Sequence, residues 1–308
     1  MTKKRVWLIV VALLLVVALW QMDRQSLWYS LRHVPLWLVG LLLGLQVVTQ
    51  LLVNAQWYGI ARIAGVPLSY GALFYVNSQG AVMDAITPGV KFGGEVTRAV
   101  QLCRAGHCTG EQAAALVALQ KLFSLSALSL VLLFVAGMLS PWLYGALAVL
   151  LVLFGAVFVM PHRLQGYLSQ RKAPRFVWIR RVRGFVLALL AQVLQLRRYK
   201  RAWVGLAGLS LLIWALYPVK MLLLVRAFYP DAGVLPVAAV TFAAYLVAML
   251  PVFPGGLGGF EATMAGGLVA MGAAVSNAAV LTVVFRFAKF WFVMLGSLVY
   301  IALRGKNR

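Results

Sequence analysis

Long apolar segments alternate with short basic segments along almost the whole chain. A helix rises about 1.5 Å per residue, so about 20 apolar residues cross a bilayer core of about 30 Å. Membrane spans are predicted at residues 6–20, 36–58, 111–137, 143–160, 202–225 and 278–303. The pattern therefore predicts an all-α polytopic membrane protein, a helical bundle forming a single transmembrane domain over residues 1–308.

Two apolar regions are interrupted by glycine, proline and charge. Residues 70–105 contain Pro-Gly-Val-Lys-Phe-Gly-Gly-Glu, and residues 236–277 contain Pro-Gly-Gly-Leu-Gly-Gly-Phe-Glu. Irregular backbone at membrane depth is tolerated only where it is buried in protein or lines a watery cavity. We therefore expect two re-entrant or broken-helix regions, although a solvent-exposed loop is the simpler alternative for either one alone.

The two interruptions share an order and a spacing. Proline and glutamate lie seven positions apart in both, as Pro88 with Glu95 and as Pro254 with Glu261. Interrupted segments at corresponding places in two halves are typical of transporters built from inverted repeats. The charge pattern makes the first region enter from the inside and the second from the outside, as inversion requires.

Basic residues lie mostly beside the apolar segments. The chain is 63% hydrophobic with a net charge of +22 and a mean hydropathy of +0.93, which excludes a soluble domain and favours basic loops over nucleic-acid binding. This predicts cytoplasmic N- and C-termini. Residues 161–201 carry many bases and no acid, so we expect a basic cytoplasmic loop near anionic phospholipids, with an interfacial helix at 185–196. Lys220 is expected to reach the outer end of its span.

Several charged residues lie within or beside sequence of membrane depth, where each is costly and requires a partner or a wet cavity. Arg286 and Lys289 share one helix face, which we expect to meet either Glu261 or a lipid phosphate. Ion pairs that fix the bundle are the alternative to a polar cavity. The candidate headgroup ligands are Glu95, Arg98, Lys121, Glu261, Arg286 and Lys289, with Asp84 for coupling and with Pro88, Gly89, Gly94, Pro254, Gly255, Gly256 and Gly258 as cavity backbone.

The sequence offers no recognisable cofactor or metal site. Cys103, His107 and Cys108 are close in sequence but lack a local fourth ligand for zinc, and their predicted cytoplasmic position disfavours a disulfide. No nucleotide-binding motif is present, so an ion gradient, the membrane potential or equilibration would drive any transport.

These motifs resemble the transmembrane-domain family of lysylphosphatidylglycerol synthases, a flippase-like family. The resemblance rests on residues 87–89, on Gly-Glu-Val-Thr-Arg-Ala at 94–99, on residues 254–258 leading to Glu261, and on Arg286. It implies a protein of the bacterial or archaeal cytoplasmic membrane that handles polar lipids. Family members often carry Glu-Arg and a later aspartate in the middle span, where this chain has Gln120, Lys121 and Ser124. In the bifunctional relatives a separate cytosolic domain makes the aminoacyl lipid, and this chain of 308 residues is not expected to be an aminoacyltransferase.

The leading hypothesis is a lipid translocase that moves an anionic or aminoacylated phospholipid through a polar cavity. A membrane-embedded lipid-modifying enzyme that uses Asp84, Glu95 or Glu261 as acid or base is an alternative, disfavoured because no histidine pair or nucleophile arrangement accompanies them. A noncatalytic lipid-binding partner of a lipid or envelope biosynthesis enzyme is the third possibility.

Overall fold

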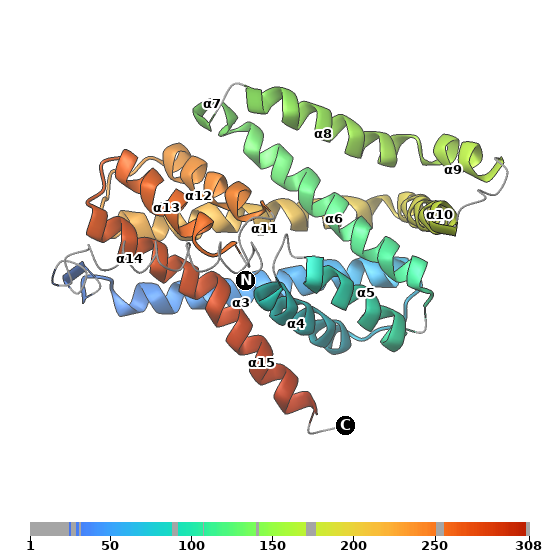
Figure 1. Ribbon diagram of the computed structural model, residues 1–308, viewed down its shortest axis with the longest axis horizontal. Helices are drawn as coiled ribbons and strands as arrows, with labels where there is room; N and C mark the ends of the chain where they lie inside the picture. The colour runs from blue at the N-terminus through green and yellow to red at the C-terminus, as the bar shows by residue number, and fades with distance from the viewer. Residues whose placement is uncertain are drawn as a thin grey trace, which may run out of the picture.

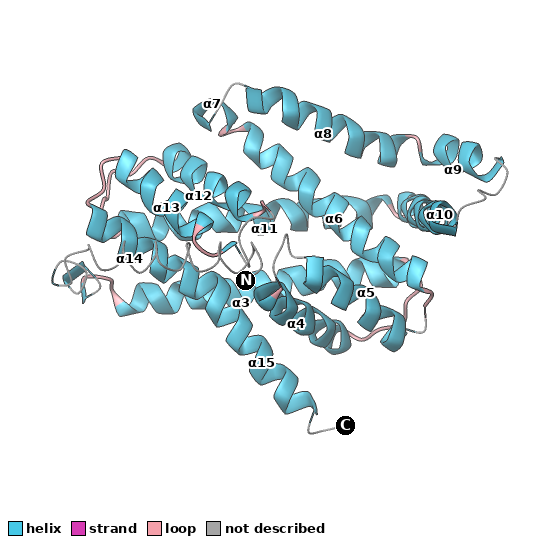
Figure 2. Ribbon diagram, viewed as in Figure 1, coloured by secondary structure: helices cyan, strands magenta, loops and turns pink. Residues whose placement is uncertain are grey.

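The computed structural model describes residues 25, 29–30, 32–87, 92–106, 108–139, 142–170, 177–250 and 256–305. Helices dominate these ranges, and neither the described residues nor Figure 2 shows a strand. Five stretches are long and apolar enough to cross a membrane: Leu36–Ile63, Gly110–Leu133, Trp142–Val159, Lys200–Arg226 and Val275–Arg304. The prediction of an all-α polytopic membrane protein is confirmed, while the expected span at 6–20 lies outside the described residues.

The first interrupted region forms a pair of antiparallel helices, α4 (Tyr70–Ile86) and α5 (Phe92–Gly106). Ser69 begins α4 by accepting a hydrogen bond from the Ala72 N–H. Gly94 lets the two helices approach closely, because a Cβ there would overlap the Asp84 carboxylate and the Gly80 carbonyl oxygen.

The second interrupted region forms a similar pair, α12 (Val234–Ala248) and α13 (Gly259–Ala270). A Cβ on Gly267 would lie 2.6 Å from Val240, and one on Gly256 would lie 2.8 Å from the Ala248 side chain. Both interrupted regions are therefore helical hairpins held together at glycines. Re-entry of the two hairpins into the bilayer stays a prediction.

Two long helices, α3 (Leu36–Ile63) and α11 (Lys200–Arg226), pack antiparallel through the middle of the molecule (Figure 1). Gln56 contacts Ser210, and Gln46 contacts Lys220. Each helix precedes one hairpin in the chain. The two hairpins are followed by α6 (Gly110–Leu133) and by α14 (Val275–Arg286), so each half contains a long helix, a hairpin and another membrane helix.

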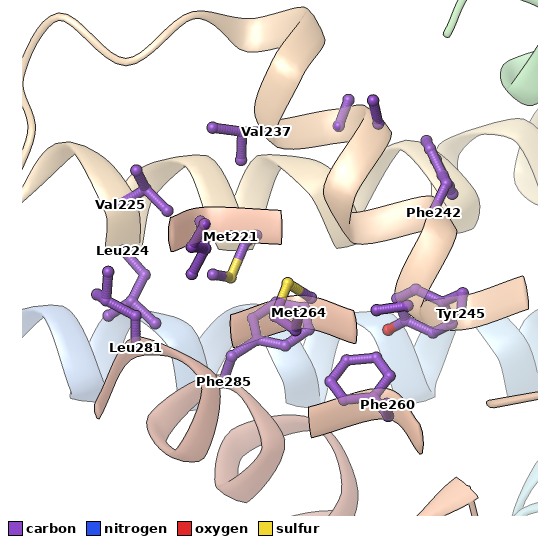
Figure 3. Close-up of a cluster of buried hydrophobic side chains, with 14 of the residues drawn as sticks. Met221, Leu224, Val225, Val237, Phe242, Tyr245, Phe260, Met264, Leu281 and Phe285 are labelled. Carbon is purple, nitrogen blue, oxygen red and sulfur yellow. The ribbon is translucent and has the colours of Figure 1, made fainter. Parts of the chain in front are cut away.

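The apolar interior divides into two clusters of buried side chains. The larger gathers around the second hairpin, where Phe260, Met264 and Phe285 pack with residues of α11 and α12 (Figure 3). The smaller surrounds Leu73, Leu102 and other side chains of α3, α4, α5, α6 and α10. Each hairpin is thus anchored in a core of its own, and the space between the cores is available for polar groups.

The last helical run continues from α14 through a π-helical turn, η2 (Phe287–Trp291), into α15 (Phe292–Gly305). The periphery consists of α7 (Ala136–Leu139), α8 (Trp142–Val159), α9 (Pro161–Gln170) and α10 (Val177–Arg198), with α8 along one edge of the molecule (Figure 1). The helix expected at 185–196 therefore begins earlier, because the basic residues before it join the helix. Its place at the bilayer surface stays a prediction.

Candidate functional site

A cavity of about 230 Å³ lies between the two halves. A cavity needs about 10–15 Å³ of such space to hold one water, so this one has room for several waters or for a polar group. Its lining comes from α3, α4, α5, α6, α11, α12, α14, η2 and α15. The charged residues of the described lining are Asp84, Glu95, Arg98, Lys121, Arg286 and Lys289.

The first hairpin contributes a chain of ion pairs to this cavity. Arg98 on α5 places its two terminal nitrogens 3.0 Å from Asp84 Oδ2 and 3.1 Å from Glu95 Oε1. Lys121 on α6 completes the chain with a 2.6 Å contact to Glu95 Oε1. The close packing at Gly80 leaves no room for a side chain beside Arg98, since a Cβ there would lie 2.5 Å from Arg98 Nε. The planar guanidinium can therefore hold two carboxylates in fixed positions.

The second hairpin contributes one ion pair at the start of α13. Glu261 Oε2 accepts a 2.7 Å hydrogen bond from the Gly258 N–H, and its Oε1 lies 3.0 Å from Arg286 Nε. A carboxylate in the first turn is favourable because the helix N-terminus carries partial positive charge. Gly258 has a φ of +84°, which only glycine adopts at low cost. Glu261 thus ties the interruption to α14, although it is not itself part of the cavity lining.

Aromatic rings contact the two cations of the second half, Lys289 and Arg286. Lys289 Nζ lies 3.1 Å from the centre of the Tyr245 ring and 4.9 Å from that of Tyr217. The Arg286 guanidinium lies 4.9 Å from the Phe260 centre. Such contacts attract a cation to the negative face of a ring. Lys289 falls within η2, and π-helical turns frequently occur at functional sites.

Amide and hydroxyl groups form another wall of the cavity. Gln120 donates to Gln56 over 3.1 Å, and Gln56 donates to Ser210, which links α6, α3 and α11. Trp214 donates to Ser124 over 3.1 Å. Sequence reasoning missed this wall, although Gln46, Gln50 and Asn54 recur at helical spacing in an apolar span and gave a usable signal.

The structure places Lys220 away from its predicted position at the outer end of the span. Its side chain does not reach the end of α11 but lies inside the bundle, with the residue only 2% exposed. It donates to Gln46 Oε1 over 2.6 Å and to Thr49 Oγ1 over 3.0 Å. The expectation was wrong because closeness to a helix end does not show which face of the helix a residue occupies.

The structure brings the sequence candidates together. The charged candidates meet at one place, and the expected ion pairs and the expected polar cavity both occur there. Gly94 packs against Asp84, Gly256 lines the cavity, and Gly258 begins α13. Pro88, Gly89, Pro254 and Gly255 lie outside the described residues. The headgroup-binding roles of all these residues stay predictions.

Cys103, in the last turns of α5, lies close to Cys108, in the turn before α6. Cys103 donates to the Cys108 carbonyl oxygen over 2.9 Å, and both thiols are free. Burial raises the pKa of Cys108, and the neighbouring Cys103 raises it further. Among the described residues, no group of three or more His, Cys, Asp or Glu side chains is arranged to hold a metal ion.

Comparisons with known proteins agree with this architecture. The family described as the lysylphosphatidylglycerol synthase TM region matches residues 6–297. A UPF0104 membrane protein of Methanothermobacter thermautotrophicus is 26% identical over 272 residues, which covers 81% of this chain and 80% of that protein. The family match extends across the two hairpins and the cavity between them.

Proposed function

The chain belongs to the lysylphosphatidylglycerol synthase TM-region family, and from that premise we propose that it moves a polar lipid headgroup between membrane leaflets through the central cavity. The lipid is an anionic or aminoacylated phospholipid or a related lipid. The observation that carries the proposal is the cavity itself, where charged side chains from both halves surround a space of headgroup size.

The charges of the lining support an anionic group at this place. Four described lining residues are basic and two are acidic. Arginine suits a phosphate because its planar fork donates to two oxygens at once, and lysine adds a mobile point charge. We propose that Arg98, Lys121, Arg286 and Lys289 contact the headgroup, while Glu95 and Glu261 orient these cations and Asp84 serves any coupling to ions.

The paired halves support a path that opens alternately to the two leaflets. The hairpins share a motif, and the helices that precede them cross antiparallel, as in inverted-repeat transporters. The acyl chains would stay in lipid while the headgroup crosses. We place the protein in the bacterial or archaeal cytoplasmic membrane with both termini cytoplasmic, where the basic segment 161–201 faces anionic lipids. A lipid or envelope biosynthesis enzyme is a possible partner.

The enzyme alternative finds less support in the site. Asp84 and Glu95 are both engaged in ion pairs with Arg98, so neither is presented to a lipid as a lone acid or base. His33 and His162, in the described part of the chain, are exposed and do not line the cavity.

Leaflet exchange of fluorescent phospholipids in proteoliposomes tests the proposal. We expect the wild type to accelerate exchange, and we expect Glu261→Gln and Arg286→Ala to slow it at least tenfold. Arg180→Gln is the matched control, because Arg180 is exposed on α10 and does not line the cavity. Folded wild-type protein that fails to accelerate exchange, with or without a proton gradient, would refute translocation. Conversion of labelled lipid to a product would support the enzyme alternative.

A further inference from the structure

Lys220 is a buried cation beside the cavity but outside its lining. Its ammonium donates to the Gln46 amide oxygen and to the Thr49 hydroxyl. The Thr49 hydroxyl in turn donates to the Leu45 carbonyl oxygen over 2.7 Å, which directs a lone pair toward Lys220. The 2.6 Å contact with Gln46 is short, as expected when the donor is charged. The site is therefore built to hold an ammonium group.

The partners of Lys220 are neutral, whereas those of the other buried cations are not. Arg98 is paired with two carboxylates and Arg286 with one. Within the described ranges, no carboxylate lies within 4.0 Å of Lys220 Nζ. Its positive charge is solvated by dipoles but is not cancelled locally, so its field extends into the surroundings.

The residues that contact Lys220 also line the cavity. Gln46, its closest acceptor, is part of the lining, and so is Tyr217, whose ring centre lies 4.9 Å from Lys220 Nζ. Lys289 Nζ lies 4.9 Å from the same ring centre on the cavity lining. The two ammonium groups are therefore about 10 Å apart at most.

The ring of Tyr217 begins a row of three aromatic rings, followed by Tyr245 and Phe260. The centres of Tyr217 and Tyr245 are 5.0 Å apart, and those of Tyr245 and Phe260 are 5.6 Å apart. Lys220, Lys289 and Arg286 lie along this row, and Glu261 is the carboxylate paired with it. The hydroxyl of Tyr245, a residue only 4% exposed, has no hydrogen-bond partner in the described part of the chain and is available to donate to an anion.

We infer that Lys220 determines substrate specificity: its fixed positive charge makes the cavity select headgroups of net negative charge over zwitterionic ones. The inference rests on the proposed function and names the substrate class of the same site. A phosphate diester without an amine is attracted by Lys220, Lys289 and Arg286 together. In a zwitterion, repulsion of the ammonium offsets most of that attraction.

The size of the effect follows from the distances. A headgroup charge bound beside Lys289 would lie about 10 Å from Lys220. Two unit charges at that distance, at an effective dielectric constant of about 20, interact by enough to change an equilibrium about tenfold. Lys220 adds positive electrostatic potential to the cavity from outside its lining and does not touch the lipid. Removing its charge should therefore alter the preference between headgroups more than it alters the transport machinery.

Matched fluorescent phosphatidylglycerol and phosphatidylcholine, each in proteoliposomes of egg phosphatidylcholine with one tenth phosphatidylglycerol, provide the test. We expect the wild type to exchange phosphatidylglycerol about tenfold faster than phosphatidylcholine, or more. Lys220→Met should lower the ratio severalfold, with Lys289 and Arg286 accounting for the remainder, and Lys220→Arg should keep it.

A second variant guards against a folding defect in Lys220→Met. Gln46→Glu keeps the shape of the side chain and the contact with Lys220 but adds the missing carboxylate, so it should also lower the ratio toward one. An unchanged ratio in both neutralising variants would overturn the inference, because Lys220 would then only pack α3 against α11. Equal slowing of both lipids would have the same meaning.

A binding measurement separates this inference from the proposed function. Short-chain phosphatidylglycerol should raise the thermal unfolding temperature of detergent-purified protein more than short-chain phosphatidylcholine does, and Lys220→Met should reduce the difference. That result without any leaflet exchange would refute translocation and support an anion-selective site. Exchange without headgroup preference would support translocation and refute the role of Lys220.

Discussion

Lys121 on α6 forms a 2.6 Å ion pair with Glu95 on α5, at the end of the chain of charges that begins with Asp84. Arg286 and Glu261 form the corresponding contact in the other half. In both halves, the glutamate that closes the interrupted motif pairs with a base on the next membrane helix. The repeated motif is therefore also a repeated interaction.

The long helices α3 and α11, which precede the two hairpins, cross antiparallel. Gln46 contacts Lys220, and Gln56 contacts Ser210, so both pairs follow the single register that any antiparallel packing requires. The inverted-repeat relation between the two halves stays a prediction.

The buried pair between Glu261 and Arg286 should matter for stability as well as for transport. Their side chains are 22% and 6% exposed. Removing one partner of a buried pair costs about 3–5 kcal/mol, because the other charge is left uncompensated. We expect Glu261→Gln to lower the free energy of unfolding by about 3 kcal/mol, near the lower end since Glu261 is partly exposed. Denaturant titration of detergent-purified protein measures this.

The double variant Glu261→Gln/Arg286→Gln distinguishes charge from shape. It removes both charges, so it should recover most of the lost stability while remaining inactive in exchange. If the double variant is as unstable as Glu261→Gln alone, the hydrogen bond to the Gly258 N–H and the packing of α13, rather than the uncompensated charge, would explain the loss.

Glycine at position 94 should be indispensable for the first hairpin. A methyl group there would overlap Asp84 and the backbone of α4. Overpacking of this kind costs about 1–3 kcal/mol, and a rigid backbone neighbour places Gly94→Ala near the upper end. Gly266→Ala is the matched control, since Gly266 is exposed in α13 and nothing lies within 4 Å of an added Cβ. That change should leave stability equal or raise it by up to about 1 kcal/mol. Equal effects of the two substitutions on the unfolding temperature would contradict the packing.

The thiol of Cys108 should react slowly at neutral pH. Burial and the neighbouring Cys103 hold its pKa above the ordinary value of 9.0, so the reactive thiolate is scarce below that pH. We expect its alkylation by N-ethylmaleimide, followed by mass spectrometry, to be slower at pH 8 than in the SDS-unfolded chain, and to keep accelerating above pH 9. Cys103→Ser should speed the reaction. Equal rates in folded and unfolded protein would show that burial does not protect the thiol.

Hydropathy predicted the described spans to within a few residues, because the bilayer fixes their length and polarity. The motif glutamates and their basic neighbours were predicted as a group, because charge at membrane depth is costly wherever it occurs. Glu261 was named as one of two possible partners of Arg286, but the pairing of Arg98 with Asp84 was not predicted, since these residues meet only after the hairpin folds at Gly94. The polar wall of Gln56, Gln120 and Ser210 was missed, because a few polar residues spread over a long apolar span leave its mean hydropathy high.

Lys121 and Arg98 should respond differently to neutralisation, although both pair with Glu95. The Lys121 side chain is 37% exposed and Glu95 keeps Arg98 when Lys121 is lost, so Lys121→Gln should lower stability by less than about 1 kcal/mol. Arg98 is 12% exposed and separates two carboxylates, so Arg98→Gln should cost about 3 kcal/mol or more by leaving Asp84 and Glu95 without it. Adding Asp84→Asn to Arg98→Gln should recover part of that loss.

Lys121→Gln should nevertheless slow phosphatidylglycerol exchange, because it removes the most accessible cation of the first half. Exchange at the wild-type rate in a stable Lys121→Gln protein would remove Lys121 from the residues proposed to contact the headgroup.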